Sequence, residues 1–360
     1  MLKSGRRWIC HNIQLTNTPS CYHLPRPLDR KSLHYWHTSR GCPYDCRFCA
    51  RWTGRRYRCV TPWQEEEQHL PLARRSAQAL KEWLLARLAL ELGGKISAPE
   101  LEERLEACHG QSTGLEVPKL KDKILIAITD DDFLVNRQRI YEFCREVERL
   151  GLGNYFEFSA ISSVRSLFKG DEIDTELVES LRRGNFRYLN LGTDGLSQAT
   201  IDQNHKGYSL DQHVIPLNKY LKSQGFFVFN NVIFTTPYTT LPELIESLIL
   251  SAVCPFPTNI FAETAIIGRI GTKFNNEDVV NQRFDWRGGD GKDMGHYFIR
   301  DGYRIPKGFM EYALNSNIIS YADPVVRDLA PLLTTMEHPS ILEKILPQPE
   351  VWQVIRRWQH

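Results

Sequence analysis

The chain has 360 residues, of which 42% are hydrophobic and 24% are charged. These values are typical of a globular protein with a sizeable core, arranged as one large domain or two small ones. The formal net charge of +2 gives no clear signal for a nucleic acid as a partner. No apolar run is long enough to span a bilayer, and the N-terminus lacks the apolar stretch of a secretory signal. The sequence therefore predicts a cytoplasmic protein that does not enter a membrane.

The first predicted strand, 34–39, leads directly into the stretch RGCPYDCRFCARW. This stretch places Cys42, Cys46 and Cys49 within eight residues, whereas the remaining cysteines of the nine are scattered. A scattered, odd set of cysteines is not typical of a secreted disulfide framework. In a reducing compartment, clustered thiolates most often hold a metal ion or a metal cluster.

The identity of that metal is open on the cysteines alone. A single zinc ion prefers four ligands, usually supplied as two close pairs, and this chain has no second pair. His34 or His37 would have to be the fourth ligand, at a spacing that is not typical of zinc sites. On a four-iron cluster, by contrast, three cysteines would each hold one iron and leave the fourth iron for a substrate. Both readings remain possible at this point.

A long segment separates the cysteines from the second predicted strand. It contains a charged amphipathic helix, roughly 65–92, and a second helix that opens with a capping box formed by Ser97 and Glu100. We treat 60–120 as a helical insertion. It is interpreted either as a lid or docking surface, or as a solvated pair of helices.

From residue 123 onward, predicted strands alternate with helices. Asp174 and Gly184 are the expected start and end of one helix. Thr240 and Glu243 form a capping box at the start of another helix. Pro216 falls inside a third predicted helix. The predicted helices are 136–150, 174–184, 210–224 and one beginning after Thr240. The remaining predicted strands are 123–128, 155–159, 186–191, 226–234 and 259–267. This alternation predicts parallel βαβ units, in which the loops after the strands share one edge of the sheet.

The stretch CPYDCRFC resembles the cluster motif of radical S-adenosylmethionine (SAM) enzymes, including the aromatic Phe48 before the last cysteine. The resemblance implies that Cys42, Cys46 and Cys49 bind a 4Fe–4S cluster whose open iron takes the amino and carboxylate groups of SAM. It further implies that one electron cleaves SAM to methionine and a 5′-deoxyadenosyl radical, which abstracts hydrogen from a substrate. A one-electron donor of the flavodoxin or ferredoxin type is the implied partner.

The resemblance covers roughly 34–275 and implies a partial (β/α)6 TIM-like barrel. The expected organisation is a lead segment, 1–33, a radical SAM core, 34–290, and a helical C-terminal extension, 291–360. The helical insertion follows the first strand of this core. In such barrels the active site is built from the loops at the C-terminal ends of the strands.

After the second predicted strand, Asp130, Asp131, Asp132 and Phe133 resemble the Asp-Asp-x-Phe variant found in a group whose members often carry a cobalamin-binding domain. The resemblance implies that Asp130 or Asp131 holds the amino group of SAM, because a carboxylate and an ammonium form a charge-assisted hydrogen bond. It also implies that Phe48 packs near the adenine. The alternative is that the aspartates cap the following helix.

Two later loops also resemble SAM-binding segments. Ser159 or Ser162 is a candidate for ribose binding, and Arg165 for the SAM carboxylate, although an ordinary hydroxyl-rich loop explains the same residues. Asp194 stands where the family has Glu, which implies a ribose or methionine contact; the alternative is a turn-forming Asp before Gly195. The run NHKG that follows also resembles family members.

The implied activity is that of a radical SAM enzyme of unknown substrate. Cobalamin is a possible further cofactor, but 1–33 is too short for its binding domain and the chain has no Asp-x-His-x-x-Gly motif. A methyltransferase that receives cobalamin in trans is therefore one alternative. The other is a non-catalytic scaffold or metal-binding protein that keeps a radical SAM-like fold.

Overall fold

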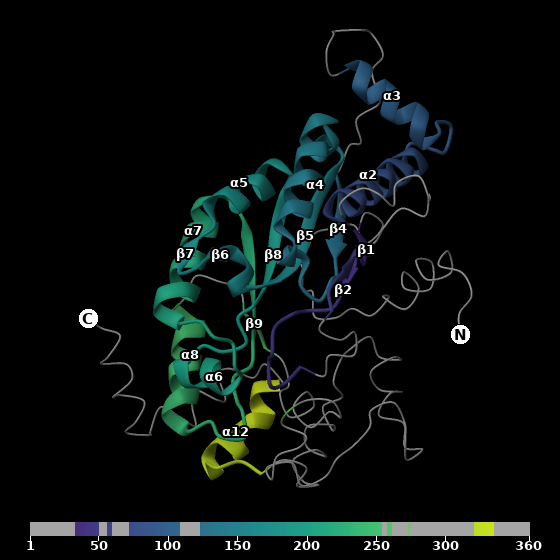
Figure 1. Ribbon diagram of the computed structural model, residues 1–360. Helices are drawn as coiled ribbons and strands as arrows, with labels where there is room; N and C mark the ends of the chain where they lie inside the picture. Colours follow the sequence, from purple (N-terminus) through teal and green to yellow (C-terminus); the bar gives the residue numbers. More distant parts are fainter. Residues whose placement is uncertain are drawn as a thin grey trace.

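The computed structural model describes residues 33–49, 56–59, 72–108, 123–253, 258–260, 273 and 320–334. Its main body is a six-stranded sheet in the order β1-β4-β5-β8-β9-β10, and every neighbouring pair is parallel (Figure 1). The strands are β1 (Leu33–Trp36), β4 (Ile124–Ile128), β5 (Phe156–Ser163), β8 (Phe186–Gly192), β9 (Phe227–Val232) and β10 (Thr258–Ile260). The spatial order follows the chain order, so the predicted α/β fold of successive βαβ units is confirmed. The predicted strand 259–267 lies mostly outside the described residues.

Helices pack on one face of this sheet. The strand β4 is buried along its whole length, as expected for a parallel strand in the interior of a sheet. Alternate side chains Ile124, Ile126 and Ile128 join the hydrophobic core on the helical side. The covering helices are α2 (Leu72–Glu91), α4 (Arg137–Arg149), α5 (Thr175–Arg183), α7 (Ile215–Ser223) and α8 (Leu241–Val253).

The helix α2 is the crossover helix of the first βαβ unit. It lies beside α4 (Figure 1) and buries Leu80, Leu84 and Leu88 completely. Its Trp83 stacks on Trp36 at the end of β1, with ring centroids 4.2 Å apart. The predicted helices of the 60–120 segment are present, the second as α3 (Ala98–Cys108). The interpretation as a solvated pair is wrong for α2, because its apolar stripe closes the core.

Sequence-based helix caps are observed at several positions. Asp174 accepts a hydrogen bond from the backbone N–H of Leu177 at 3.1 Å, and Gly184 ends α5. The carboxylate of Glu243 accepts from the N–H of Thr240 at 2.8 Å. Pro216 is accommodated because the predicted helix divides into a short π-helical turn, η6 (Leu210–Val214), and α7, whose first turn contains the proline.

The C-terminal region contributes α12 (Pro324–Thr334), which packs on α8. Asp323 accepts from the N–H of Leu241 at 2.8 Å and from the N–H of Val325 at 2.9 Å, so one carboxylate caps both helices. The rest of the predicted extension, and the lead segment, lie outside the described residues. Among the residues that are described, no helix is both long and apolar enough to cross a membrane.

Candidate functional site

The cysteine loop, residues 41–49, begins at a backbone position that only glycine fits. β2 (Ser39–Arg40) pairs antiparallel with β3 (Arg58–Cys59) and delivers the chain to Gly41. Gly41 has φ +90°, and a Cβ there would overlap the carbonyl oxygen of Arg56. Both features exclude other residues. The start of the loop is therefore held close against the backbone of Arg56.

None of the three cysteines of this loop is in a disulfide. Cys46 is buried, and Cys42 and Cys49 are half-buried. Burial raises the pKa of Cys42 to about 12 and also raises that of Cys46, because poorly hydrated surroundings disfavour a thiolate. Three sulfur ligands with no histidine form a soft donor set that suits an iron–sulfur cluster.

The three cysteines are less suited to binding a single metal ion than to binding a cluster. Within the described part of the chain, no three His, Cys, Asp or Glu side chains are grouped so that they could hold one ion. His37, a candidate zinc ligand, instead contacts the hydroxyl of Thr129 at 3.1 Å. In a cluster each cysteine binds a different iron, so the sulfur atoms need not converge on one point. The three thiols thus fit a cluster.

A buried lysine lies against the cysteine loop. The Nζ of Lys206 is 3.4 Å from the Sγ of Cys46 and 2.5 Å from a carboxylate oxygen of Asp194. It also lies 5.7 Å from the ring centroid of Phe48. Burial lowers the pKa of Lys206, but Asp194, Tyr208 and Cys46 outweigh burial and hold it well above its usual value. Sequence analysis placed Lys206 in the NHKG run but gave it no role.

Two strained residues bring this lysine into place. Asp194 and His205 adopt the left-handed region at φ 50° and 55°, which is uncommon for residues other than glycine. The amide of Asn204 donates to the carbonyl of Asp194 at 2.8 Å, and the carbonyl of Asn204 accepts from the N–H of Arg47 at 3.2 Å. The loop after β8 is thereby joined to the cysteine loop.

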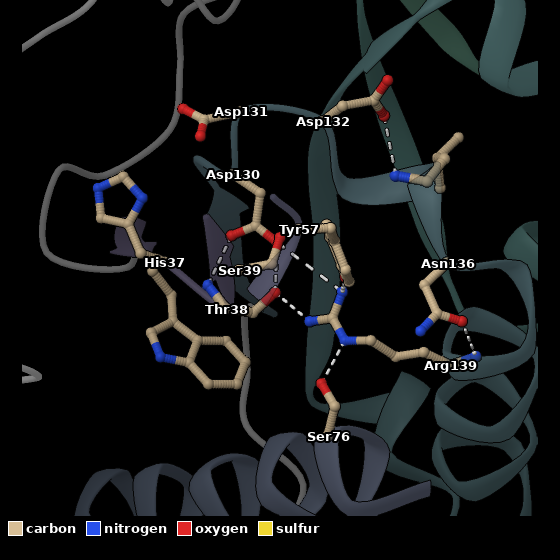
Figure 2. Close-up of polar contacts among 12 residues, drawn as sticks. His37, Thr38, Ser39, Tyr57, Ser76, Asp130, Asp131, Asp132, Asn136 and Arg139 are labelled. Atoms are coloured by element: carbon tan, nitrogen blue, oxygen red, sulfur yellow. Dashed lines mark hydrogen bonds and ion pairs between the residues drawn. The ribbon is translucent and has the colours of Figure 1, made fainter. Parts of the chain in front are cut away.

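The aspartates after β4 point in different directions (Figure 2). Asp130 is buried, and its oxygens accept from the N–H and hydroxyl of Thr38, each at 2.5 Å, and from the hydroxyl of Ser39 at 2.6 Å. Asp131 is exposed and accepts from the N–H of Gly41 at 2.7 Å. Of the two aspartates considered for SAM, Asp131 is therefore the accessible one.

A buried arginine completes the surroundings of Asp130. Arg139 is fully buried, and its Nη1 lies 3.8 Å from a carboxylate oxygen of Asp130. It also donates to the hydroxyls of Thr38, Ser76 (2.5 Å) and Tyr57 (3.2 Å) (Figure 2). Sequence analysis missed this residue, because its place on an amphipathic helix gave no sign of a partner near β1.

Asp132 has the capping role that was the alternative for this run. It accepts from the N–H of Leu134 at 3.0 Å and the N–H of Ser163 at 3.1 Å. The hydroxyls of Ser162 and Ser166 also donate to it, at 3.0 and 2.8 Å. Burial raises the pKa of Asp132 to about 6, although all four hydrogen bonds oppose the shift.

The serines after the third predicted strand need a correction. β5 continues to Ser163, four residues beyond the predicted end, so Ser159 lies inside the strand and not in a loop. Ser159 is buried, and its hydroxyl accepts from the amide of Asn190 at 3.1 Å. Arg165 is exposed and donates to the carbonyl of Gly207. A SAM contact for Ser159 stays a prediction.

No protein-family model matches this sequence, and no curated protein matches it.

Similar solved structures are radical SAM enzymes. The cobalamin-dependent enzyme OxsB, with aqua-cobalamin and SAM bound, is 18% identical, with a TM-score of 0.41 and coverage of 60% of this chain and 26% of that chain. TsrM from Kitasatospora setae, with cobalamin and a [4Fe-4S] cluster, is 14% identical (TM-score 0.41, coverage 66% and 39%). HemN from Escherichia coli, a coproporphyrinogen III oxidase, is 16% identical (TM-score 0.39, coverage 69% and 46%). The matched region thus spans less than half of each of these chains.

Proposed function

We propose that this chain is a radical SAM enzyme that cleaves SAM reductively with a 4Fe–4S cluster and modifies an unknown substrate through a 5′-deoxyadenosyl radical. The observation that carries the proposal is the arrangement of Cys42, Cys46 and Cys49. They are three cysteines outside any disulfide, in a C-x3-C-x2-C spacing on the loop that follows the first strand of a parallel sheet. Ligands of α/β folds bind at this edge, because the loops of successive βα units meet there.

Each proposed role follows from a position in this site. Cys42, Cys46 and Cys49 hold the cluster, which with SAM supplies the electron transfer and the radical when both are bound. Asp131 binds the amino group of SAM, because it is exposed beside Gly41 whereas Asp130 is enclosed by Thr38 and Ser39.

On the other side of the loop, Lys206 stabilises negative charge at the Cys46 sulfur. Asp194 holds Lys206 in place through the 2.5 Å ion pair. Asp194 thus acts through the lysine as well as through any direct ribose or methionine contact. Phe48, which lies below the same ammonium group, is the proposed neighbour of the adenine.

The reaction consumes one electron per SAM, so a donor of the flavodoxin or ferredoxin type is the proposed partner. Cobalamin remains a possible additional cofactor.

The direct test is anaerobic. The protein is reconstituted with iron and sulfide, treated with dithionite and SAM, and examined for 5′-deoxyadenosine by mass spectrometry, with Cys46→Ala as the control. We expect product from the wild type and loss of product in the variant, because one iron loses its ligand. Zinc bound stoichiometrically without sulfide, or equal product from both proteins, would contradict the proposal.

A further inference from the structure

The run Asp130–Asp132 contacts the cysteine segment at more than one point. Asp130 receives hydrogen bonds from Thr38 and Ser39, which immediately precede the cysteine loop. Asp132 reaches the loop through one hydroxyl: Tyr44 and Ser166 are hydrogen-bonded at 2.8 Å, and Ser166 donates to Asp132 at 2.8 Å. The N–H of Gly41 also donates to Asp131 at 2.7 Å, so two loops that are far apart in sequence are joined at three places.

The contact made by Asp130 is rigid, because its polar groups are buried and are hydrogen-bonded to one another. Asp130 and Arg139 both have side chains with no exposed surface, and the hydroxyl of Thr38 bridges them. Loss of either charge would leave the other buried without a partner, which is strongly unfavourable. Thr38 and Ser39 are thus held in one position relative to β4, three and two residues before Gly41.

The Asp132 contact fixes the middle of the loop. A carboxylate has about four acceptor positions, and Asp132 fills them with the four donors described above. The hydroxyl of Ser166 donates to Asp132, so the O–H of Tyr44 is the donor to Ser166. Tyr44 lies between Cys42 and Cys46, so restraining its ring restrains the two cysteines around it.

We propose that Asp130 and Asp132 are positioning residues that hold the cysteine loop in its cluster-binding conformation, Asp130 through Thr38 and Ser39 and Asp132 through Ser166 and Tyr44. This inference rests on the proposed function, since it assumes that the loop holds a cluster. It differs from the role implied by the family resemblance, in which the aspartates after the second strand bind SAM. Here only Asp131 keeps that role, and its two neighbours act through the loop.

The test uses substitutions that remove the connecting hydroxyls and leave the aspartates intact. In the reconstituted full-length protein, Tyr44→Phe breaks the link from Asp132, and Ser39→Ala removes one of the three hydrogen bonds that Asp130 accepts from Thr38 and Ser39. The rate of iron release to a chelator is measured without SAM, beside the electron paramagnetic resonance spectrum of the reduced cluster. We expect each variant to release iron roughly fivefold faster than wild type, the factor that corresponds to one ordinary hydrogen bond. The melting temperature of the cluster-free protein should fall by only about 2 °C, the shift that one hydrogen bond gives in a chain of this size.

Matched controls separate this effect from general destabilisation. Tyr141 lies on α4, and its buried hydroxyl has no hydrogen-bond partner among the described residues. Tyr141→Phe should therefore release iron at the wild-type rate. On α8, Ser251→Ala removes a hydroxyl that donates to the helix carbonyl of Leu248, and it should behave like wild type.

Three results would overturn the proposal. Iron release at the wild-type rate in both Tyr44→Phe and Ser39→Ala would show that the links do not hold the loop. Weaker SAM binding in equilibrium dialysis, with unchanged iron release, would assign these residues to SAM instead. If the wild type itself takes up no iron and sulfide, the proposed function fails and this inference fails with it. If the wild type holds a stable cluster and the variants release iron at the same rate, only the positioning role is rejected.

Discussion

At the scale of single residues, the ion pair between Lys206 and Asp194 is a tightly held feature of the site. Its two side chains are 6% and 12% exposed and 2.5 Å apart. The strained backbone of Asp194 places its carboxylate under the ammonium group. Breaking a buried pair by removing one partner is costly, because the remaining charge is left without compensation.

We therefore expect Lys206→Met to destabilise the cluster-free protein by about 3 kcal/mol. Asp194→Asn should have a similar effect, and the double variant should cost less than the sum, because the second substitution removes a charge that is already unpaired. Urea unfolding of the four proteins measures this coupling. Strictly additive effects would show that the two groups do not stabilise each other.

Two titratable groups, the buried Asp132 and the half-buried His37, give opposite pH dependences. The pKa of Asp132 is raised from 3.8 to about 6, so the folded protein keeps a proton that the unfolded chain loses, and stability falls as pH rises from about 4 to 6. Burial, followed by Arg40, lowers the pKa of His37 from 6.5 to about 4, so stability rises as pH rises from about 4 to 6.5. Each effect amounts to about 3 kcal/mol.

Because these contributions oppose each other, the free energy of unfolding of the wild type should change little from them between pH 4 and 6.5. Asp132→Asn removes the falling contribution, so its stability should rise more steeply with pH than that of the wild type. His37→Gln removes the rising contribution and should give the opposite slope. Urea titrations at several pH values compare the slopes, and three parallel curves would refute the assignment.

At the scale of elements, the helix α2 has a structural role that its sequence pattern alone did not indicate. Its charged, amphipathic sequence was compatible with a solvated insertion. The structure makes it the connection between the adjacent parallel strands β1 and β4, packed on α4. A parallel pair requires such a crossover, so the helix belongs to the core of the fold.

The packing of α2 predicts a large difference between two leucines of the same helix. Leu84 is completely buried, whereas Leu90 is 65% exposed. We expect Leu84→Ala to lower the free energy of unfolding by about 3 kcal/mol and Leu90→Ala to change it by less than about 0.5 kcal/mol. Denaturant unfolding of both variants checks this. Equal, small effects would mean that α2 does not close the core.

At the scale of the whole molecule, the order of the strands in the sheet brings the residues of the site together. Strands that are neighbours in sequence are neighbours in space, so the loops after β1, β4 and β8 reach the same region. Gly41 thus meets Asp131, 90 residues later, and Cys46 meets Lys206, 160 residues later. No single loop contains the site.

The sequence by itself determined the local features. Hydrophobic periodicity and caps such as Asp174 and Glu243 depend on residues within a few positions of one another, so the strands and helices between 123 and 253 were predictable with boundaries close to those observed. The same holds for the spacing of Cys42, Cys46 and Cys49, which is a property of one short stretch. The predicted strand 34–39 is instead divided between β1 and β2. The end of β5 was missed, because its hydroxyl-rich continuation reads as a loop and becomes a strand only by pairing with β8.

Only the tertiary structure decided how the polar residues divide their roles. Three consecutive aspartates look alike in sequence, yet their side chains point in different directions: Asp130 meets Arg139, Asp131 meets Gly41, and Asp132 meets serines at the end of β5 and just beyond it. The position of Lys206 beside Cys46 was likewise decided only by the tertiary structure. These assignments depend on partners far away along the chain and on burial, which sets the energy of each charge, and neither is contained in a local pattern.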